Sequence, residues 1–209
     1  MKKIIITGGL GFIGSHLVRL FLKSNYKVLN IDSQTYASIK NLQFLNHKNY
    51  TFSKIDIANF KKLKKRILSF SPDYIINCAA ESHVDRSITG PKIFVTSNII
   101  GTFNILEILR NIKKKIRFLQ VSTDEVFGSL KRNSLKFNEI TRYDPMSPYS
   151  ASKASADHFV RSYGNTYNID YIITNCSNNY GPYQNPEKLI PKVILSCIFK
   201  DQIPVYGKD

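Results

Sequence analysis

The chain has 209 residues, and its 30 Lys and Arg against 15 Asp and Glu give a formal net charge of +15 at neutral pH. Hydrophobic residues make up 43% of the sequence and charged residues 22%, which excludes a wholly disordered chain and is typical of one globular domain, or of one domain and part of another. No apolar run approaches the length of a membrane span or of a signal peptide, and the three cysteines (Cys78, Cys176 and Cys197) lie far apart, so we expect a cytoplasmic protein without a membrane segment.

Short β-branched runs alternate with helical patterns from the N-terminus onward. They predict strands over Lys3–Thr7, Lys27–Asp32, Tyr50–Asp56, Tyr74–Ala79, Arg117–Ser122 and Asp170–Asn175, and helices over Phe12–Ser24, Asn59–Ser69, Pro91–Asn111, Pro148–Tyr167 and Ile190–Phe199. Several strands are apolar on both faces, as in a parallel sheet covered by helices. The predicted fold class is therefore α/β, with a doubly wound parallel sheet of the Rossmann type. The alternation stops near Cys176, which predicts one domain over 1–175 and the start of a smaller C-terminal region over 176–209.

The basic excess follows helical patterns. Between Phe60 and Phe70 the apolar residues 60, 63, 67 and 70 keep helical spacing, so the intervening lysines are predicted to lie on the outer face of an amphipathic helix. A nucleic-acid or anionic-surface binder is the alternative interpretation. Aromatic residues do not alternate with the basic ones, as they do in platforms that bind single strands, so we do not expect a nucleic-acid partner.

A glycine string follows the first predicted strand. Gly8, Gly11 and Gly14 stand between that strand and a helical pattern, where glycines allow a tight turn and a close approach of the backbone to a pyrophosphate at the helix N-terminus. Asp32 closes the second strand, where a carboxylate suits a ribose 2′-hydroxyl and repels a 2′-phosphate. The combination predicts an NAD site. Two further candidate contacts on the adenine side, which an ordinary acidic strand terminus explains equally well, are Asp56 and Ile57.

Three Tyr-x-x-x-Lys pairs occur, and about one is expected by chance in a chain this rich in both residues. Tyr36/Lys40 stand in a predicted loop and Tyr50/Lys54 on a predicted strand. Tyr149 and Lys153 instead open a predicted helix, behind the N-cap signal Ser147-Pro148, so they share one helical face. An ammonium beside a phenol favours the phenolate, and we expect Lys153 to help lower the pKa of Tyr149. Beside a dinucleotide, such a tyrosine is a candidate base for a sugar hydroxyl.

Two carboxylates follow the fifth predicted strand, in Ser122-Thr123-Asp124-Glu125. Adjacent acids are usually a solvated turn, but in α/β sheets ligands bind at the carboxyl ends of the strands. There Asp124 and Glu125 offer a general acid and a general base, which oxidation of a hydroxyl alone does not need. They suit the elimination of water next to a newly formed ketone.

Several segments of the chain resemble one family. The glycine string is accompanied by Ala79-Ala80-Glu81-Ser82-His83-Val84-Asp85-Arg86-Ser87, Ser122-Thr123-Asp124-Glu125-Val126, Ser147-Pro148-Tyr149-Ser150-Ala151-Ser152-Lys153 and Thr174-Asn175-Cys176-Ser177-Asn178-Asn179-Tyr180-Gly181-Pro182. Together they resemble the extended short-chain dehydrogenase/reductases and, within them, the dTDP-glucose 4,6-dehydratases, over essentially the whole chain. The glycine string and the Tyr/Lys pair occur throughout the superfamily. The Thr-Asp-Glu triplet and the run that begins at Ala79 are far more specific.

The resemblance implies an NAD-dependent hydro-lyase that acts on dTDP-glucose or a similar nucleotide sugar in deoxysugar (rhamnose-type) biosynthesis. Tyr149, helped by Lys153 and Thr123, would deprotonate the glucosyl 4-hydroxyl as hydride passes to NAD. Glu125 would then remove the C5 proton while Asp124 protonates the departing C6 hydroxyl, and hydride would return to C6 to give dTDP-4-keto-6-deoxyglucose. The implied cofactor contacts are Gly8, Gly11, Phe12, Ile13, Gly14, Asp32, Asp56, Ile57, Ala79, Ala80, Tyr149, Lys153 and Asn179. The implied substrate contacts are Ser82, Thr123, Asn178, Lys188, Leu189 and Ile190, and no metal site is expected.

The resemblance also implies a homodimer that pairs through the helices near Pro91–Asn111 and Pro148–Tyr167. Family members continue beyond Asp209 with most of the sugar-nucleotide domain, so residues 176–209 are expected to be a partial sugar-nucleotide-binding region. We therefore expect the 209-residue chain to bind NAD but to turn over dTDP-glucose poorly or not at all. The alternatives are a related nucleotide-sugar 4-epimerase, another nucleotide-sugar dehydratase, or a catalytically impaired NAD-binding fragment.

Overall fold

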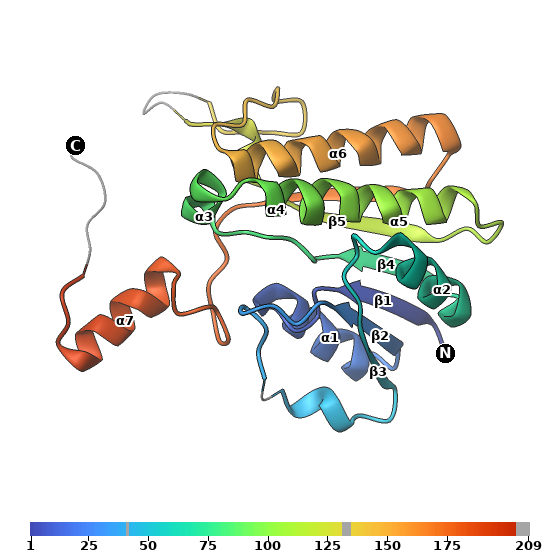
Figure 1. The fold of residues 1–209 in the computed structure, drawn as a ribbon, viewed down its shortest axis with the longest axis horizontal. Coiled ribbons are helices and arrows are strands. Elements are labelled where there is room, and N and C mark those ends of the chain that lie inside the picture. The colour runs from blue at the N-terminus through green and yellow to red at the C-terminus, as the bar shows by residue number, and fades with distance from the viewer. Residues whose placement is uncertain (41, 131–134, 204–209) are drawn as a thin grey trace. The chain divides into compact units, whose positions relative to one another are not determined.

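Six parallel strands form the sheet at the centre of the first part of the chain (Figure 1). The computed structural model describes residues 1–40, 42–130 and 135–203. The order of the strands in the sheet is β3-β2-β1-β4-β5-β6, which confirms the predicted doubly wound α/β fold. The strands are β1 (Lys3–Thr7), β2 (Lys27–Asp32), β3 (Tyr50–Lys54), β4 (Tyr74–Asn77), β5 (Arg117–Thr123) and β6 (Tyr171–Cys176).

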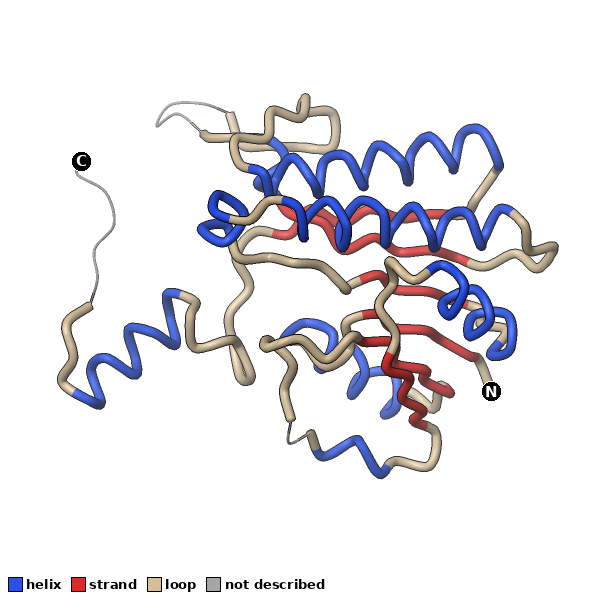
Figure 2. The backbone as a smooth tube through the Cα atoms, in the orientation of Figure 1, coloured by secondary structure: helices blue, strands red, loops and turns tan. Residues whose placement is uncertain are grey.

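Helices cover both faces of this sheet, and Figure 2 shows them on either side of the red strands. Because successive strand side chains point to opposite faces, Ile4 and Ile6 of β1 pack with Val18 of the first helix, whereas Ile5 packs with Leu63 in the core on the other face. The first core contains α1 (Phe12–Lys23), and the second contains α2 (Phe60–Phe70), α5 (Gly101–Arg110) and α6 (Pro148–Tyr167). Both cores hold the carboxyl ends of the strands at a fixed rim.

Helix α2 carries much of the basic excess on its outer side. Leu63 and Ile67 are fully buried, whereas the neighbouring lysines 61, 62, 64 and 65 are exposed, as the helical spacing predicts. Phe60 was expected to share the buried face and is 40% exposed instead. Phe60 is the first residue of α2, directly after the N-cap Asn59, so it lies at the end of the helix rather than in the middle of its buried face.

The predicted helix Pro91–Asn111 consists of three segments. These are α4 (Lys92–Phe94), a π-helical turn, η2 (Val95–Ile100), and α5 (Gly101–Arg110). A π turn inserts an extra residue into a helix and cannot be found from a 3.6-residue period. Short elements without periodicity were missed, namely α3 (Val84–Thr89) and the 3₁₀ turns η1 (Gln43–Asn46) and η3 (Asp124–Phe127).

Strand ends differ from prediction by one or two residues. β3 and β4 stop before the predicted Asp56 and Ala79, and β6 begins and ends one residue later than predicted. The polar segment between η3 and α6 is irregular where it is described, and its residues 131–134 lie outside the described part of the chain.

The stretch Lys92–Arg110 is, by length and composition alone, long and apolar enough to cross a membrane, a feature that the sequence was not expected to contain. Half of its most apolar window is buried within the protein. Ile105, Leu106, Ile108 and Leu109 belong to this buried part and pack against the sheet. The apolar character of this helix is therefore accounted for by its place in the core.

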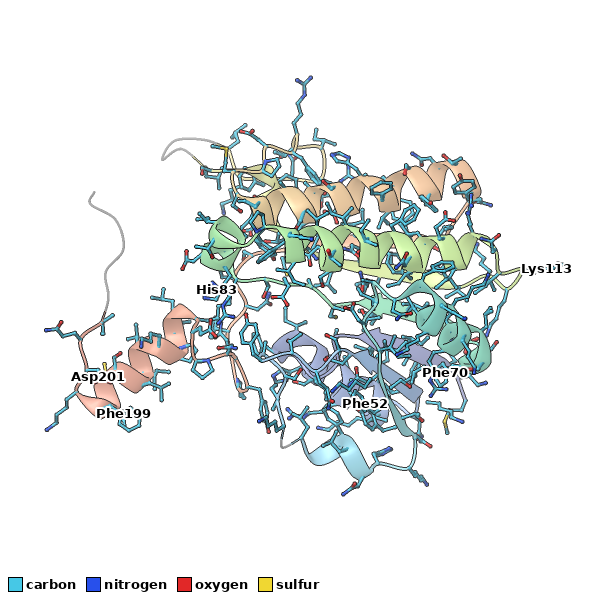
Figure 3. All side chains as sticks on the ribbon, viewed as in Figure 1. Phe52, Phe70, His83, Lys113, Phe199 and Asp201 are labelled. Carbon is cyan, nitrogen blue, oxygen red and sulfur yellow. The ribbon has the colours of Figure 1, made fainter. Side chains whose placement is uncertain are left out.

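The chain divides into two compact units, Met1–Ser177 and Asn178–Asp209. In the second unit a turn-rich segment leads into α7 (Leu189–Phe199), which begins one residue before its predicted start. Most of the apolar side chains of α7 are exposed, and Figure 3 labels one of them, Phe199, at its end.

Candidate active site

The turn from β1 into α1 requires glycine. Gly8 has a left-handed backbone (φ 68°), and a Cβ there would lie 2.7 Å from the backbone nitrogen of Ala79. The N–H of Gly11 donates to the carbonyl oxygen of Gly8 at 3.0 Å, and a Cβ on Gly14 would overlap that same carbonyl. The glycines thus bring the N-terminus of α1 against the loop that follows β4, as a backbone cradle for a pyrophosphate would require.

A pocket lies beside this turn. Its walls come from the end of β2, from the loops that follow β1, β2, β3 and β4, and from Ser97 on η2. The strand order reverses between β1 and β4, so the loops after these two strands flank the reversal. The predicted cofactor contacts that line it are Gly8, Gly11, Asp32, Asp56, Ile57, Ala79 and Ala80. The predicted contacts Phe12, Ile13 and Gly14 are not among its lining residues, because they form the first turn of α1.

Asp32 is buried at the end of β2 and organises the loop that follows it. Its Oδ2 accepts the N–H of Leu10 at 3.0 Å, and its Oδ1 accepts the N–H of Gln34 at 2.8 Å and the hydroxyl of Ser38 at 3.3 Å. A carboxylate has about four acceptor positions, so these three bonds leave room for a further donor such as a ribose hydroxyl. The backbone cradle, the pocket and this acid together fit a dinucleotide.

A second group of predicted residues gathers where β5 ends. Tyr149 is 8% exposed on the first turn of α6, and its hydroxyl is hydrogen-bonded to the side chain of Thr123. Thr123 also accepts the N–H of Glu125 at 3.2 Å and so fixes the start of η3, which carries Asp124 and Glu125. Three predicted catalytic groups of the β5 loop thus lie around the predicted tyrosine.

The N-terminus of α6 is built as the sequence predicts. The N–H of Ser150 donates to Oγ of Ser147 at 3.1 Å, the N–H of Ser147 donates to Oγ of Ser150 at 2.9 Å, and Pro148 opens the helix. This reciprocal cap holds Tyr149 at a fixed point on the rim.

The pKa of Tyr149 was expected to be lowered with help from Lys153, but in the protein chain it is raised. Burial, followed by the charge of Glu125, raises the pKa of Tyr149 well above its ordinary value, and the hydrogen bond from Thr123 lowers it only in part. Lys153 lies four residues further along α6, is 4% exposed, and donates to the carbonyl oxygen of Val121 at 2.6 Å. Burial lowers the pKa of Lys153, opposed first by the charge of Asp157.

One residue that positions the site was missed from the sequence. Asn98, on the π turn, is buried; it accepts the N–H of Glu81 at 2.9 Å and donates to the carbonyl of Glu81 at 3.0 Å and to Ser152 Oγ at 2.8 Å. It therefore ties the loop after β4 to α6 beside Lys153. Other pocket residues that were not predicted are Ile31, Ser33, Thr35, Ala37, Ser38, Ile55, Cys78, Glu81 and Ser97.

The remaining predicted residues lie elsewhere. Ser82 is exposed in the loop after β4 and does not line the pocket. The five others belong to the second unit, where Lys188 precedes α7 as its N-cap and Leu189 is 76% exposed. The full set in that unit is Asn178, Asn179, Lys188, Leu189 and Ile190.

Comparison with known proteins identifies the family. Residues 5–209 match the family model described as GDP-mannose 4,6 dehydratase. The chain belongs to this family. A protein of Sinorhizobium fredii described as a probable dTDP-glucose 4,6-dehydratase is 48% identical over 98% of the chain, and the dTDP-glucose 4,6-dehydratase of Salmonella typhimurium is 47% identical over 99%.

The structure is similar to that of a solved family member. The crystal structure of dTDP-glucose 4,6-dehydratase from Bacillus anthracis in complex with NAD superposes with a TM-score of 0.89 at 43% identity, over 99% of this chain and 64% of that one. The chain spans 61% and 62% of the lengths of the Sinorhizobium and Salmonella relatives.

Replacing Asn98 by alanine is expected to destabilise the chain by about 3 kcal/mol, because it leaves both backbone groups of Glu81 and the hydroxyl of Ser152 without this buried partner. Urea unfolding followed by circular dichroism measures the loss. The matched control is Asn111→Ala on the same helical stretch, where the exposed amide donates to the carbonyl of Glu107 and its removal should cost less than about 1 kcal/mol. Equal losses of unfolding free energy in the two variants would show that the hydrogen bonds of Asn98 to the backbone of Glu81 add nothing to stability.

Proposed function

We propose that the chain is the NAD-binding and catalytic part of a dTDP-glucose 4,6-dehydratase. The observation that carries the proposal is the meeting of Thr123, Asp124 and Glu125 with the buried Tyr149 at the end of β5. A base for the sugar hydroxyl and an acid–base pair for removing water are the groups that this reaction needs and that a simple oxidation does not. The 48% identical relative described as a probable dTDP-glucose 4,6-dehydratase supports the same activity.

NAD is the proposed cofactor, and it would accept a hydride from C4 of the sugar and return one to C6. The turn at Gly8 and Gly11 would hold its pyrophosphate, and Asp32 would accept a hydrogen bond from a hydroxyl of its adenosine ribose. NAD is proposed rather than NADP because a buried carboxylate at that point repels an additional phosphate. Asp56, Ile57, Ala79 and Ala80 would complete the pocket walls. The relative from Bacillus anthracis, solved in complex with NAD, supports this assignment.

The chain's own side chains would move the protons. Tyr149 would take the proton of the 4-hydroxyl, with Thr123 donating a hydrogen bond to the developing phenolate and Lys153 supplying positive charge. Glu125 would remove the proton from C5, which the neighbouring ketone acidifies, and would return a proton to C5 when hydride is added at C6. Asp124 would protonate the hydroxyl that leaves from C6, so that one molecule of water is lost.

The substrate is proposed to be dTDP-glucose or a closely similar nucleotide sugar, with Ser82, Thr123 and residues of the second unit facing it. Phe12, Ile13, Gly14 and Asn179 remain proposed cofactor contacts, and Asn178 and Lys188–Ile190 proposed substrate contacts. We place the protein in the cytoplasm, because Cys78, Cys176 and Cys197 are free thiols, which suits a reducing compartment.

A homodimer is also proposed. Helices α5 and α6 run side by side in Figure 1, and apolar side chains remain exposed along them and the adjoining turns. Val95 is 47% exposed, Ile100 43% and Phe159 37%. A second copy would cover such residues and remove apolar surface from water.

The replacement Gly14→Ala is expected to weaken NAD binding at least tenfold. Its methyl group would overlap the carbonyl of Gly8 and force the pyrophosphate turn open. Isothermal titration calorimetry with NAD measures the affinity. The control is Gly90→Ala, where a Cβ would make an ordinary contact of 3.7 Å with the carbonyl of Arg86 and binding should not change. NAD binding by Gly14→Ala at the affinity of the unmodified chain would refute the turn as the pyrophosphate site.

The variants Glu125→Gln and Asp124→Asn are each expected to slow formation of the 4-keto-6-deoxy product by about a hundredfold or more, since each removes one partner of the general acid–base pair. The chain in excess over dTDP-glucose is incubated with NAD, and product is read from the ultraviolet absorbance of the keto sugar in alkali. Parallel incubations with UDP- and GDP-glucose test the nucleotide, and exposed Glu139→Gln is the control. An undiminished rate in both variants would show that the acids take no part.

The variant Phe159→Glu is expected to convert a dimer into a monomer, because it places a charge among apolar side chains that a second copy would bury. Sedimentation velocity should give about twice 23.9 kDa for the unmodified chain and 23.9 kDa for the variant. Leu68→Glu, on the exposed side of α2 at 50% exposure, should leave the dimer intact. A monomeric unmodified chain, or dissociation by both variants, would contradict this interface.

A further inference from the structure

A third ionisable residue lies on the buried face of α6, four residues beyond Lys153. Tyr149, Lys153 and Asp157 repeat at intervals of four, so their side chains follow one another along one side of the helix. Asp157 is fully buried, and Lys153 is 4% exposed. The proposed reaction uses Tyr149 and Lys153 and gives Asp157 no part.

The carboxylate of Asp157 is held firmly, but on one oxygen. Its Oδ2 accepts the hydroxyl of Ser122 at 2.6 Å and the hydroxyl of Tyr143 at 3.1 Å. Its Oδ1 is buried and has no hydrogen-bond partner among the described residues. A buried carboxylate with one oxygen unpaired is costly unless a positive charge lies close to it.

The surroundings of the two groups supply few competing charges. Facing Asp157 are Lys153 and Arg161 on its own helix and Tyr143 from the preceding loop, and the guanidinium of Arg161 is directed to Tyr143, to whose hydroxyl it donates at 3.1 Å. Facing Lys153 are Asp157, Cys78 after β4 and Cys176 on β6. Asp157 is therefore the carboxylate whose charge acts most strongly on the Lys153 ammonium. The two thiols are weak acids and supply little negative charge at neutral pH.

We propose that Asp157 is a positioning residue that keeps Lys153 in its ammonium form beside Tyr149, as the counter-charge that a buried lysine requires. The charge of Asp157 is the largest of the effects that oppose the loss of the proton from Lys153, and the charge of Lys153 in turn favours the carboxylate. The functional consequence rests on the proposed roles of Tyr149 and Lys153. A neutral amine would give no electrostatic help to a phenolate, so Asp157 would act on the tyrosine through the lysine.

The test is a direct titration of Lys153 in the whole chain, without nucleotide. Lysines labelled with ¹³C at Cε are followed by nuclear magnetic resonance as pH is raised, and Lys153→Arg identifies the signal of Lys153. In Asp157→Asn, which keeps the shape and can accept from Ser122 and Tyr143, the midpoint of Lys153 should move to lower pH. Asp170→Asn, which removes a carboxylate paired with Arg117 at the other end of β5, should leave that midpoint unchanged. An unchanged midpoint in Asp157→Asn overturns the proposal.

A second measurement decides the matter if Asp157→Asn is too unstable to titrate. If Asp157 is the counter-charge of Lys153, that instability comes from a buried ammonium left without a compensating negative charge. The double variant Asp157→Asn/Lys153→Met should then be more stable to urea than Asp157→Asn alone. If the double variant is as unstable as the single one, Asp157 serves only as a hydrogen-bond partner of Ser122 and Tyr143. Neither measurement depends on NAD binding or on turnover, so failure of the proposed activity would not be mistaken for failure of this inference.

Discussion

The register of the parallel sheet determines which side chains can meet, and buried polar bonds fix that register. Asn77, at the end of β4, accepts the hydroxyl of Thr7 on β1 at 2.6 Å and donates to Gln120 on β5 at 2.9 Å and to Thr102 on α5 at 3.1 Å. A shift of one residue in any of these strands would leave the amide unpaired inside the protein and would turn the neighbouring side chains to the wrong face. The loops after β1, β4 and β5 therefore start at one rim, where Gly8, Ala79 and Asp124 follow the strands.

Those features of the fold that depend on local chemistry could be predicted from the sequence. The strands, the glycine turn and the cap of α6 are each encoded within a few residues, because backbone conformation and capping are local properties. The extra helical residue at η2 is not local in this sense. Asn98, which bonds to both Glu81 and Ser152, lies in this π turn, and a 3.6-residue period in the sequence does not predict such a turn.

Protonation behaviour was the property that local pattern predicted least well. The spacing of Tyr149 and Lys153 suggests a phenol made more acidic by an ammonium, yet the depth at which Tyr149 is buried and the proximity of Glu125 act in the opposite direction and are larger. Both of these are products of tertiary structure. The spacing correctly indicates which residues share a helical face, but the balance of burial against charge depends on strands far away in the chain.

Two acids near Tyr149 and Lys153, the half-buried Glu125 and the fully buried Asp157, consequently act in opposite senses. Glu125 disfavours the phenolate of Tyr149, whereas Asp157 favours the ammonium of Lys153, from which a phenolate would draw its stabilisation. In the proposed reaction Tyr149 must lose its proton before Glu125 has gained one, so the first step takes place while Glu125 still carries its charge. Positive charge close to the tyrosine is then needed most, and a lysine this deeply buried would tend to lose its proton without a carboxylate on its far side. The spacing of Tyr149, Lys153 and Asp157 along α6 places the phenol, the ammonium and the carboxylate in that order, over about two turns of one helix.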